Sequence, residues 1–324
     1  MANKLFVAPS PHVHSTMSTQ SIMRDVIIAL MPALAVSVAV FGWSVLLVTA
    51  VSVLSCVLFE YLIQKYLIKG PSTIGNLSAV VTGVLLALTL PASIPVWIVV
   101  LGAMVAIVVG KMTFGGLGKN PFNPALVGRV FLLISYPVQM TSFPAPKGNW
   151  VDVFSGATPL AAVKNSETLA QVNFGQMLGG YIPGSLGEVA AAALLLGFVY
   201  LLWRKVITWH IPVTVLATMA VCAFVYALCS KDMTGDALWQ YPLFHVLAGG
   251  AMLGAIFMAT DYSTSPMTVK GAVIFAVGIG AITMAIRLWG AYPEGMSFAI
   301  LIMNACVPLI NKYVKPRRFG AVKK

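Results

Sequence analysis

Long runs of apolar residues dominate the chain, and short polar or glycine- and proline-containing stretches separate them. A helix that crosses a bilayer needs roughly 20 mostly apolar residues. The pattern meets this requirement repeatedly and predicts an all-α membrane protein with about ten transmembrane helices. The predicted spans are 24–42, 44–63, 74–91, 95–113, 121–136, 187–203, 207–229, 243–260, 268–288 and 295–313.

Three of these spans, the third, the fifth and the eighth, are short or contain Pro and Gly. A weak repeat of a glycine, a threonine and a proline also relates the third span to the eighth. The first copy is Gly83, Thr89 and Pro95, and the second is Gly254, Thr260 and Pro266. Because five spans lie in each half, the halves must cross the membrane in opposite directions. The pattern therefore predicts two inverted five-helix repeats with short broken helices around a binding site.

The composition supports a membrane protein and excludes some functions. Of the 324 residues, 59% are hydrophobic and 9% are charged, whereas a soluble domain has about 25% charged residues. The net charge of +11 does not indicate nucleic-acid binding, because the basic residues lie between apolar spans and not in one patch with interleaved aromatic residues. The chain is therefore expected to contact a lipid bilayer and no nucleic acid.

The lysine and arginine residues predict the orientation. With the N-terminus in the cytoplasm, most of them fall in cytoplasmic segments, as the positive-inside rule requires. The exceptions are Lys147, Lys164, Lys231 and Arg287 outside, and Arg129 within a span. The bias predicts that both termini are cytoplasmic. The expected division is a tail (1–23), a first repeat (24–136), an outer loop (137–186), a second repeat (187–313) and a basic tail (314–324).

A few polar side chains lie in or beside the apolar spans. Arg129 lies inside the fifth span, where a charge is costly and usually functional or paired; the alternative is a structural arginine that reaches a backbone carbonyl or a headgroup. Asn123, just before it, could hydrogen-bond a planar polar ligand. Asp261 could pair with Arg129, bind a cation, hydrogen-bond a ring N–H or lie in solvent. Glu60, near the end of the second span, is expected to extend to the membrane interface, with a functional role as the alternative.

The cysteines and histidines provide no evidence for a metal site in this chain alone. All four cysteines lie in apolar runs and form no C-x-x-C pair, which is typical of buried small side chains. One cysteine donated to an iron–sulfur cluster shared with another subunit stays an open alternative. His12 and His14 lack further ligands nearby, and no hydrolase arrangement is visible. A transporter and a membrane electron carrier remain.

The polar stretch 149–163 separates these two classes. It contains Asp152, Ser155, Gly156, Ala157 and Thr158, which match the D-x-x-[ST]-G-A-[ST] site at which FMN is esterified to a threonine. Together with the Asn-Pro-x-Asn-Pro-Ala-Leu-Val-Gly-Arg run and the Met-Ala-Thr-Asp turn, nearly the whole chain resembles one family. That family contains the D subunits of Rnf electron-transport complexes and, more distantly, the B subunits of sodium-pumping NADH:quinone oxidoreductases.

The resemblance implies a role for each residue of the motif. Thr158 would hold FMN through a phosphoester, made from FAD by a magnesium-dependent flavin transferase with release of AMP. Gly156 and Ala157 are small enough to enter the transferase as an extended peptide, and Asp152 and Ser155 would help that enzyme recognise the loop. No bound metal is expected on this chain.

The resemblance also implies a second, non-covalently held flavin, riboflavin. Asn123, Arg129, Thr260 and Asp261 are candidates to line either flavin. The chain would be part of an ion-translocating ferredoxin:NAD⁺ oxidoreductase in the bacterial cytoplasmic membrane, coupled to Na⁺ or H⁺ movement. Ferredoxin and NAD⁺ would bind partner subunits, because the chain has no Rossmann fingerprint. The alternatives are a cofactor-free inverted-repeat transporter or channel, and a structural membrane anchor for other redox subunits.

Overall fold

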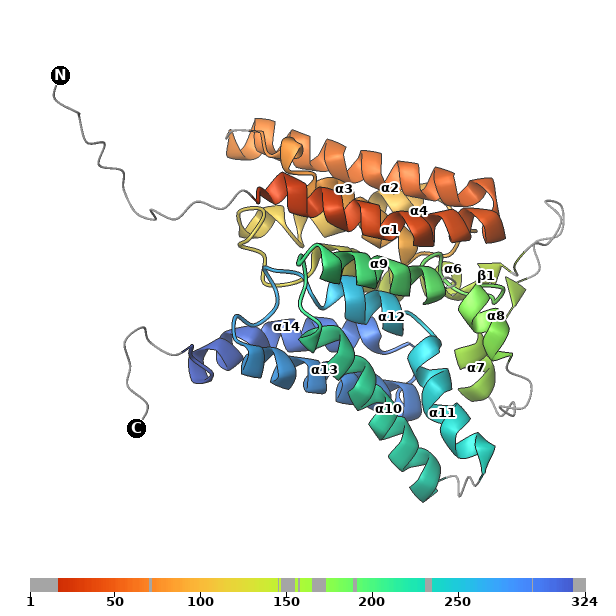
Figure 1. Ribbon diagram of the computed structural model, residues 1–324. Coiled ribbons are helices and arrows are strands. Elements are labelled where there is room, and N and C mark those ends of the chain that lie inside the picture. Colours follow the sequence, from red (N-terminus) through yellow and green to blue (C-terminus); the bar gives the residue numbers. More distant parts are fainter. Residues whose placement is uncertain are drawn as a thin grey trace, which may run out of the picture.

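The protein is a bundle of α-helices with its longest helices roughly aligned (Figure 1). The computed structural model describes residues 17–69, 72–144, 146, 155–156, 158–164, 173–188, 191–230, 235–292 and 294–316. The first half contains α1 (Thr19–Phe41), α2 (Trp43–Leu62), the π-helix η1 (Ile63–Ile68), the 3-10 helix η2 (Ile74–Asn76), α3 (Ser78–Leu88), α4 (Val96–Val108), the 3-10 helix η3 (Met112–Phe114) and α5 (Pro124–Ser135).

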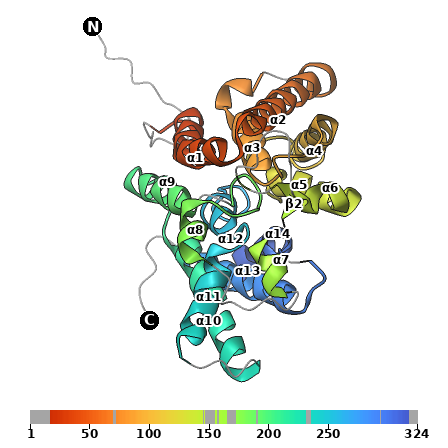
Figure 2. The same ribbon diagram turned by 90° about the vertical axis from the view of Figure 1, so that its right-hand side faces the viewer.

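Short elements connect the first half to the second. They are α6 (Pro137–Thr141), β1 (Phe143–Pro144), β2 (Ser155–Gly156), α7 (Pro159–Lys164) and α8 (Phe174–Gly179). The second half contains α9 (Ala191–Trp203), α10 (His210–Ser230), α11 (Asp236–Leu247), α12 (Ala251–Leu253), the π-helix η5 (Gly254–Met258), α13 (Val269–Trp289) and α14 (Met296–Tyr313). Figure 2, seen from the α7 end, shows the first five helices above and α10, α11, α13 and α14 below, with α12 between them.

Each predicted span coincides with helices of the structure. Among the described residues, six helices are long and apolar enough to cross a membrane. The pair Asp236–Leu247 and Ala251–Met258, bent by 60°, forms a further broken span, and Ser78–Leu88, Pro124–Ser135 and Ala191–Trp203 are shorter apolar helices. The prediction of an all-α polytopic membrane protein is confirmed. The third and fifth spans are short and the eighth is broken, as expected, but the sixth span, which was not expected to be short, is a short helix as well.

The outward faces of the helices are apolar, as contact with lipid requires. On α2, the exposed residues Leu47, Leu54 and Leu58 lie on one side, while Val45, Val48 and Cys56 are buried. A helix satisfies its backbone hydrogen bonds internally, so it can present such a face to hydrocarbon at no polar cost. Tryptophans near helix ends are also exposed, including Trp43 and Trp203, a distribution typical of membrane interfaces.

Two short helices, α3 and the α12–η5 segment, form the centre of the bundle and are almost completely buried. Both repeat glycines lie where helices approach closely. A β-carbon on Gly83 would lie 2.7 Å from Val53 Cα, and one on Gly254 would lie 2.5 Å from Met296 Cγ. Both repeat glycines therefore lie at close helix contacts, but Gly83 meets α2 and Gly254 meets α14, which are not equivalent helices of the two halves.

The two ends of the bundle differ in what they hold. Figure 1 shows the first turn of α1 and the last turn of α14 at one end, and α6, α7, α8 and the β1–β2 pair at the other. α3 begins at the α1 end, whereas α11 begins at the opposite end and leads inward to α12. The two central helices therefore run in opposite directions, as inverted repeats require.

Candidate functional site

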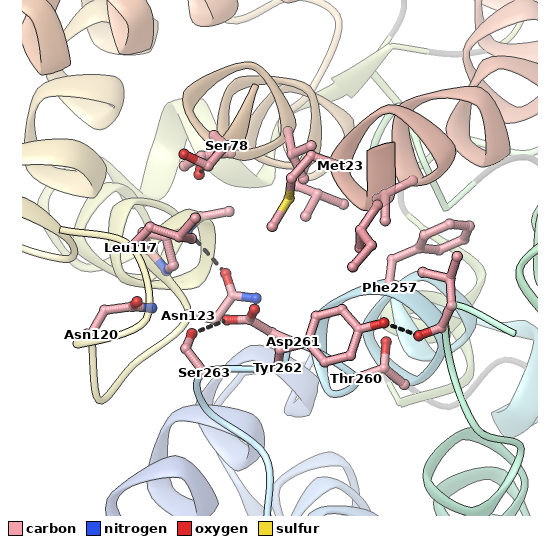
Figure 3. A pocket seen from close by; sticks show the side chains of 18 of the residues that line it. Met23, Ser78, Leu117, Asn120, Asn123, Phe257, Thr260, Asp261, Tyr262 and Ser263 are labelled. Atoms are coloured by element: carbon pink, nitrogen blue, oxygen red, sulfur yellow. Dashed lines mark hydrogen bonds between the residues drawn. The ribbon is translucent and has the colours of Figure 1, made fainter. Parts of the chain in front are cut away.

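A pocket opens between the two halves, at the end that holds the first turn of α1. Its empty space, counted together with the open solvent at its mouth, is about 740 Å³. Figure 3 shows side chains from both halves around it. Its polar lining consists of Ser78, Thr82, Lys111, Asn120, Asn123, Thr260, Asp261, Tyr262 and Ser263.

Asn123 joins the two halves at the wall of this pocket. Its Oδ1 accepts hydrogen bonds from the backbone N–H groups of Ala125 (3.1 Å) and Leu126 (3.4 Å), which makes it the N-cap of α5. Pro124 follows at the first helical position, which favours this helix start. The Nδ2 of Asn123 donates to the carbonyl of Met258, 3.2 Å away in η5. One side chain therefore holds the start of α5 against the end of η5.

Asn120 provides an unused acceptor in the same pocket. It is 4% exposed, and its Nδ2 donates to the carbonyl of Phe122 (3.0 Å). Its Oδ1 has no hydrogen-bond partner among the described residues. A buried acceptor without a partner costs roughly 1–3 kcal/mol, so a ligand N–H at this position would relieve an existing cost.

Asp261 and Thr260 follow η5 and line the pocket from the second half. Asp261 accepts hydrogen bonds from Ser263 Oγ (3.0 Å) and Thr264 Oγ1 (3.3 Å). Burial raises the pKa of the Asp261 carboxyl, while the bonds from Ser263 and Thr264 oppose that rise. Thr260 Oγ1 donates to the carbonyl of Ile256 (2.6 Å), which leaves its oxygen lone pairs available as acceptors.

Arg129 does not lie in this pocket. Its guanidinium pairs with Glu294, and a β-carbon on Gly250, between α11 and α12, would lie 3.4 Å from its Nη1. Of the four residues predicted to line a flavin pocket, Asn123, Thr260 and Asp261 therefore lie together and Arg129 lies apart. The partner of Arg129 is Glu294 and not Asp261, because Arg129 points from α5 toward the break in the eighth span.

Arg129 belongs to a buried charged cluster that we call the α12 cluster: Arg129, Glu188, Arg287 and Glu294. Arg287, 4% exposed, donates to the carbonyls of His245 (2.5 Å) and Ala248 (2.8 Å) at the end of α11. Glu188 faces Glu294 and accepts from Ser185. The Nε atoms of both arginines lack partners among the described residues. The sequence placed Arg287 and Glu294 in outer loops, and their burial becomes evident only from the folded structure.

A second buried pair borders the pocket. Lys111 Nζ lies 2.6 Å from Glu60 Oε2, and their side chains are 2% and 0% exposed. The expectation that Glu60 extends to the membrane interface is therefore wrong, because its carboxylate is buried against Lys111. Each charge lies 51 residues from its partner, so no local pattern indicated the pair.

Thr158 lies at the other end of the bundle, at the start of α7, and is 5% exposed. Its Oγ1 accepts from the backbone N–H of Ala161 (3.2 Å). Leu160 lies beside the α12 cluster, because a β-carbon on Gly249 would lie 3.4 Å from Leu160 Cδ2 and 2.7 Å from Arg287 Nη2. The short helix that begins after Thr158 therefore lies beside the buried Arg287.

The rest of the motif is described in part. β2 pairs antiparallel with β1, with Phe143 opposite Gly156 and Pro144 opposite Ser155. A β-carbon on Gly156 would lie 3.3 Å from Pro183, so a small residue suits this close approach. Asp152 and Ala157, like His12 and His14, lie outside the described residues. The described part of the chain contains no group of three or more His, Cys, Asp or Glu placed to hold a metal ion.

The fold and these sites define a polytopic membrane protein with a ligand pocket between two opposed halves and a buried charged cluster beside a loop threonine. The chain belongs to the NQR2, RnfD, RnfE family, which matches residues 6–320. The resemblance seen in the motifs is therefore confirmed along almost the entire chain.

Known proteins that are similar to this chain are components of membrane oxidoreductases. Over 321 residues, it is 47% identical to the D subunit of the Na(+)-translocating ferredoxin:NAD(+) oxidoreductase complex of Acetobacterium woodii, covering 98% of this chain and 96% of that protein. It is 41% identical to the proton-translocating counterpart of Clostridium ljungdahlii, with 98% and 97% covered. It is 37% identical to the D subunit of the ion-translocating oxidoreductase complex of Escherichia coli, with 97% and 98% covered.

Proposed function

We propose that this chain is the membrane flavoprotein subunit of an ion-translocating ferredoxin:NAD⁺ oxidoreductase complex. The observation that supports this most strongly is the full-length match to relatives named as the D subunits of such complexes. In this proposal, ferredoxin and NAD⁺ bind other subunits, and this chain passes electrons across the membrane. The two relatives named for Na⁺ and for protons leave either ion as the coupled one.

The tether of the proposed cofactor is Thr158. Its Oγ1 forms the phosphoester to FMN, and the hydroxyl proton is lost in the transfer. Bound FMN supplies one- and two-electron chemistry. The α12 cluster, which lies beside Leu160 of α7, fits such a group: Arg129 and Arg287 are buried, and each has an Nε–H without a partner among the described residues. Buried guanidiniums suit a phosphodiester or a ring carbonyl, because a charged donor to an oxygen acceptor makes a strong hydrogen bond.

Attachment requires Thr158 to leave its present position. The side chain is 5% exposed and caps α7, whereas a transferase must reach Oγ1 in an extended peptide. We infer that the flavin transferase acts before the six-residue α7 docks on the second half. Lys164 then anchors α7 by donating to the carbonyls of Gly290 and Tyr292.

The pocket between the halves is the proposed site of the second flavin, riboflavin. Asn120 Oδ1 offers an unused acceptor, and Asp261 and Thr260 offer oxygens from the other half, which suits the N–H and hydroxyl groups of that molecule. In the proposed orientation both termini are cytoplasmic, so this pocket opens to the cytoplasm while Thr158 faces outside. Electrons would then pass between two flavin sites at opposite ends of the bundle.

The coupling requires a minimum energy. Moving one charge outward costs about 2.3 kcal/mol per 100 mV of membrane potential. The redox drop along the complex must supply at least this amount per ion. The contribution of this chain is to hold the two flavins at fixed positions in the membrane.

To test covalent attachment, the chain is expressed together with its flavin transferase, and flavin fluorescence is measured in a denaturing gel. The parent band should fluoresce, and Thr158→Ala should be dark. Thr141→Ala removes an exposed hydroxyl from the same segment and is the matched control, expected to fluoresce like the parent. A dark parent band contradicts the flavoprotein proposal and favours a cofactor-free transporter. Unchanged electron transfer by a complex that contains Thr158→Ala favours a structural anchor.

A further inference from the structure

A continuous chain of polar side chains runs from the pocket to the α1 end of the bundle. It begins at Lys111, which lines the pocket. Lys111 Nζ lies 2.6 Å from Glu60 Oε2 and 2.7 Å from Ser78 Oγ. Glu60 and Lys111 are almost inaccessible to solvent, although the pocket itself has an open mouth.

The second oxygen of Glu60 continues the chain outward. Glu60 Oε1 accepts a hydrogen bond from Thr73 Oγ1 (2.8 Å). Gln64 Nε2 donates to the same hydroxyl oxygen, and Gln64 Oε1 accepts from the Thr73 backbone N–H (2.9 Å). Gln64 thereby orients the Thr73 hydroxyl hydrogen toward the carboxylate. Thr73 is half-buried, so water can reach it.

The outer end of the chain meets a second, open pocket. This pocket encloses about 610 Å³, and Gln64 lines it together with Tyr61, Lys65, Lys69 and Ser72. The polar chain therefore joins an interior cavity to an aqueous surface, with no apolar residue between its members.

The stability of the fold does not require the charges of Glu60 and Lys111. Replacement of a buried ion pair by apolar residues of similar volume is often neutral or stabilising, and ionisable residues at membrane depth are usually functional. The basic partner is a lysine, which changes its protonation state when buried far more readily than an arginine does. Cys56, one turn earlier on α2, is a further titratable group that faces both charges.

We propose that Thr73, Glu60 and Lys111 form a proton-transfer path from the aqueous phase at the α1 end to the ligand in the pocket. Lys111 Nζ releases one proton to an acceptor in the pocket. Glu60, a carboxylate in the resting pair, then takes up one proton from water at Oε1 through Thr73 Oγ1, and its carboxyl group turns and passes that proton to Nζ, which restores the carboxylate and the ammonium. One proton enters and one leaves, so the path is restored after each transfer.

The inference rests on the proposed function, in which the occupant of the pocket is a flavin that takes up protons when reduced. Within that function it assigns Gln64 as a positioning residue and Lys111 as the donor at the pocket wall. If these side chains had only a structural role, the Glu60–Lys111–Ser78 contacts would hold α2, α3 and the end of α4 together. The two roles differ at Thr73, which lies outside those contacts.

The test compares Thr73→Val with Thr73→Ser in the purified intact complex. Both variants retain the Glu60–Lys111 pair, but only serine retains a hydroxyl that can accept and donate a proton. The readouts are the rate of NAD⁺ reduction by reduced ferredoxin in H₂O and in D₂O, and the content of acid-extractable flavin. Thr49→Val is the matched control, because Thr49 lies on α2 like Glu60, lines neither pocket, and its hydroxyl donates to the backbone carbonyl of Val45.

We expect Thr73→Val to slow turnover about 100-fold, the lower end of what a positioned proton donor contributes, with a larger solvent isotope effect and normal flavin content. Thr73→Ser and Thr49→Val should turn over at close to the parent rate. Should Thr73→Val fail to assemble, Thr73→Ala removes the same hydroxyl without the added methyl groups.

The path is contradicted by a Thr73→Val complex with the parent rate and the parent isotope effect. It is equally contradicted when Thr73→Ser or Thr49→Val is as slow as Thr73→Val. Absence of extractable flavin from the parent complex contradicts the second-flavin part of the proposed function alone, since the comparison of rates still decides whether the path operates.

Discussion

The starts of the two central helices, α3 and α12, are each contacted by a buried basic side chain, but that side chain binds different partners at the two places. At α3, Lys111 from the end of the fourth span binds Ser78 and the carboxylate of Glu60. At α12, Arg287 from the end of the ninth span instead binds the backbone carbonyls of His245 and Ala248. A basic residue from the equivalent helix thus supports each broken span, but one is paired with a charge and the other with helix-end dipoles.

This difference has a functional consequence. A lysine and a carboxylate in direct contact can exchange a proton, whereas an arginine bound to carbonyls can only stay charged. The α3 start is therefore suited to proton transfer. The α12 start is suited to fix a permanent positive charge beside Leu160 of α7. The inverted repeat supplies the same scaffold twice, and the chemistry differs through single side chains.

The largest effect should come from Lys111→Met, which leaves the Glu60 carboxylate buried without its partner. Removal of one member of a buried pair costs about 3–5 kcal/mol. We expect a clear drop in the thermal unfolding midpoint of the detergent-solubilised protein. The double variant Lys111→Met/Glu60→Met should recover most of that loss. A single variant as stable as the parent would show that the pair is not desolvated as the structure describes.

A smaller loss is expected for Arg287→Met. The variant removes hydrogen bonds to two carbonyls at the end of α11, and loss of a hydrogen bond to a charged group costs about 1.5–3 kcal/mol. The same unfolding assay measures it. A second substitution that removes a nearby carboxylate should not restore the lost stability, because the principal partners of Arg287 are backbone atoms. Rescue by Glu294→Gln would instead indicate that Arg287 acts mainly as a counter-ion.

The repeat glycines should differ in sensitivity. A β-carbon on Gly83 meets the backbone of Val53, whereas one on Gly254 meets the flexible side chain of Met296. Overpacking costs about 1–3 kcal/mol, and we expect Gly83→Ala at the upper end and Gly254→Ala at the lower end. Unfolding midpoints of the two variants test this order. Equal losses would contradict the difference in packing.

The smallest effect concerns the pH dependence introduced by Asp261. Because burial raises its pKa, the folded protein binds this proton more tightly than the unfolded chain does. The resulting stability is fully present below the unfolded pKa of about 3.9 and is lost as the pH rises through the folded value. Asp261→Asn should therefore lose less stability than the parent as the pH is raised from acid to neutral. Parallel pH profiles would contradict this sign.

Local sequence patterns predicted the spans and the motif, because both depend on residues close together in the chain. The apolar runs predicted every span, and the repeat glycines Gly83 and Gly254 both lie at close helix contacts. The sequence patterns did not predict which charged side chains pair with each other. Lys111 and Glu60 are 51 residues apart, and Arg129 and Glu294 are 165 apart. Since partners in a bundle are decided by helix packing, Asp261 was a plausible partner for Arg129 until the structure placed Glu294 there.

The central claim is that Thr158 holds a covalent flavin. Mass spectrometry of the peptide that contains Thr158, from protein produced with its flavin transferase, tests this most directly. The account predicts the added mass of FMN less one water, with fragments that place it on Thr158. An unmodified Thr158 peptide in protein that carries flavin elsewhere, or none, would contradict it.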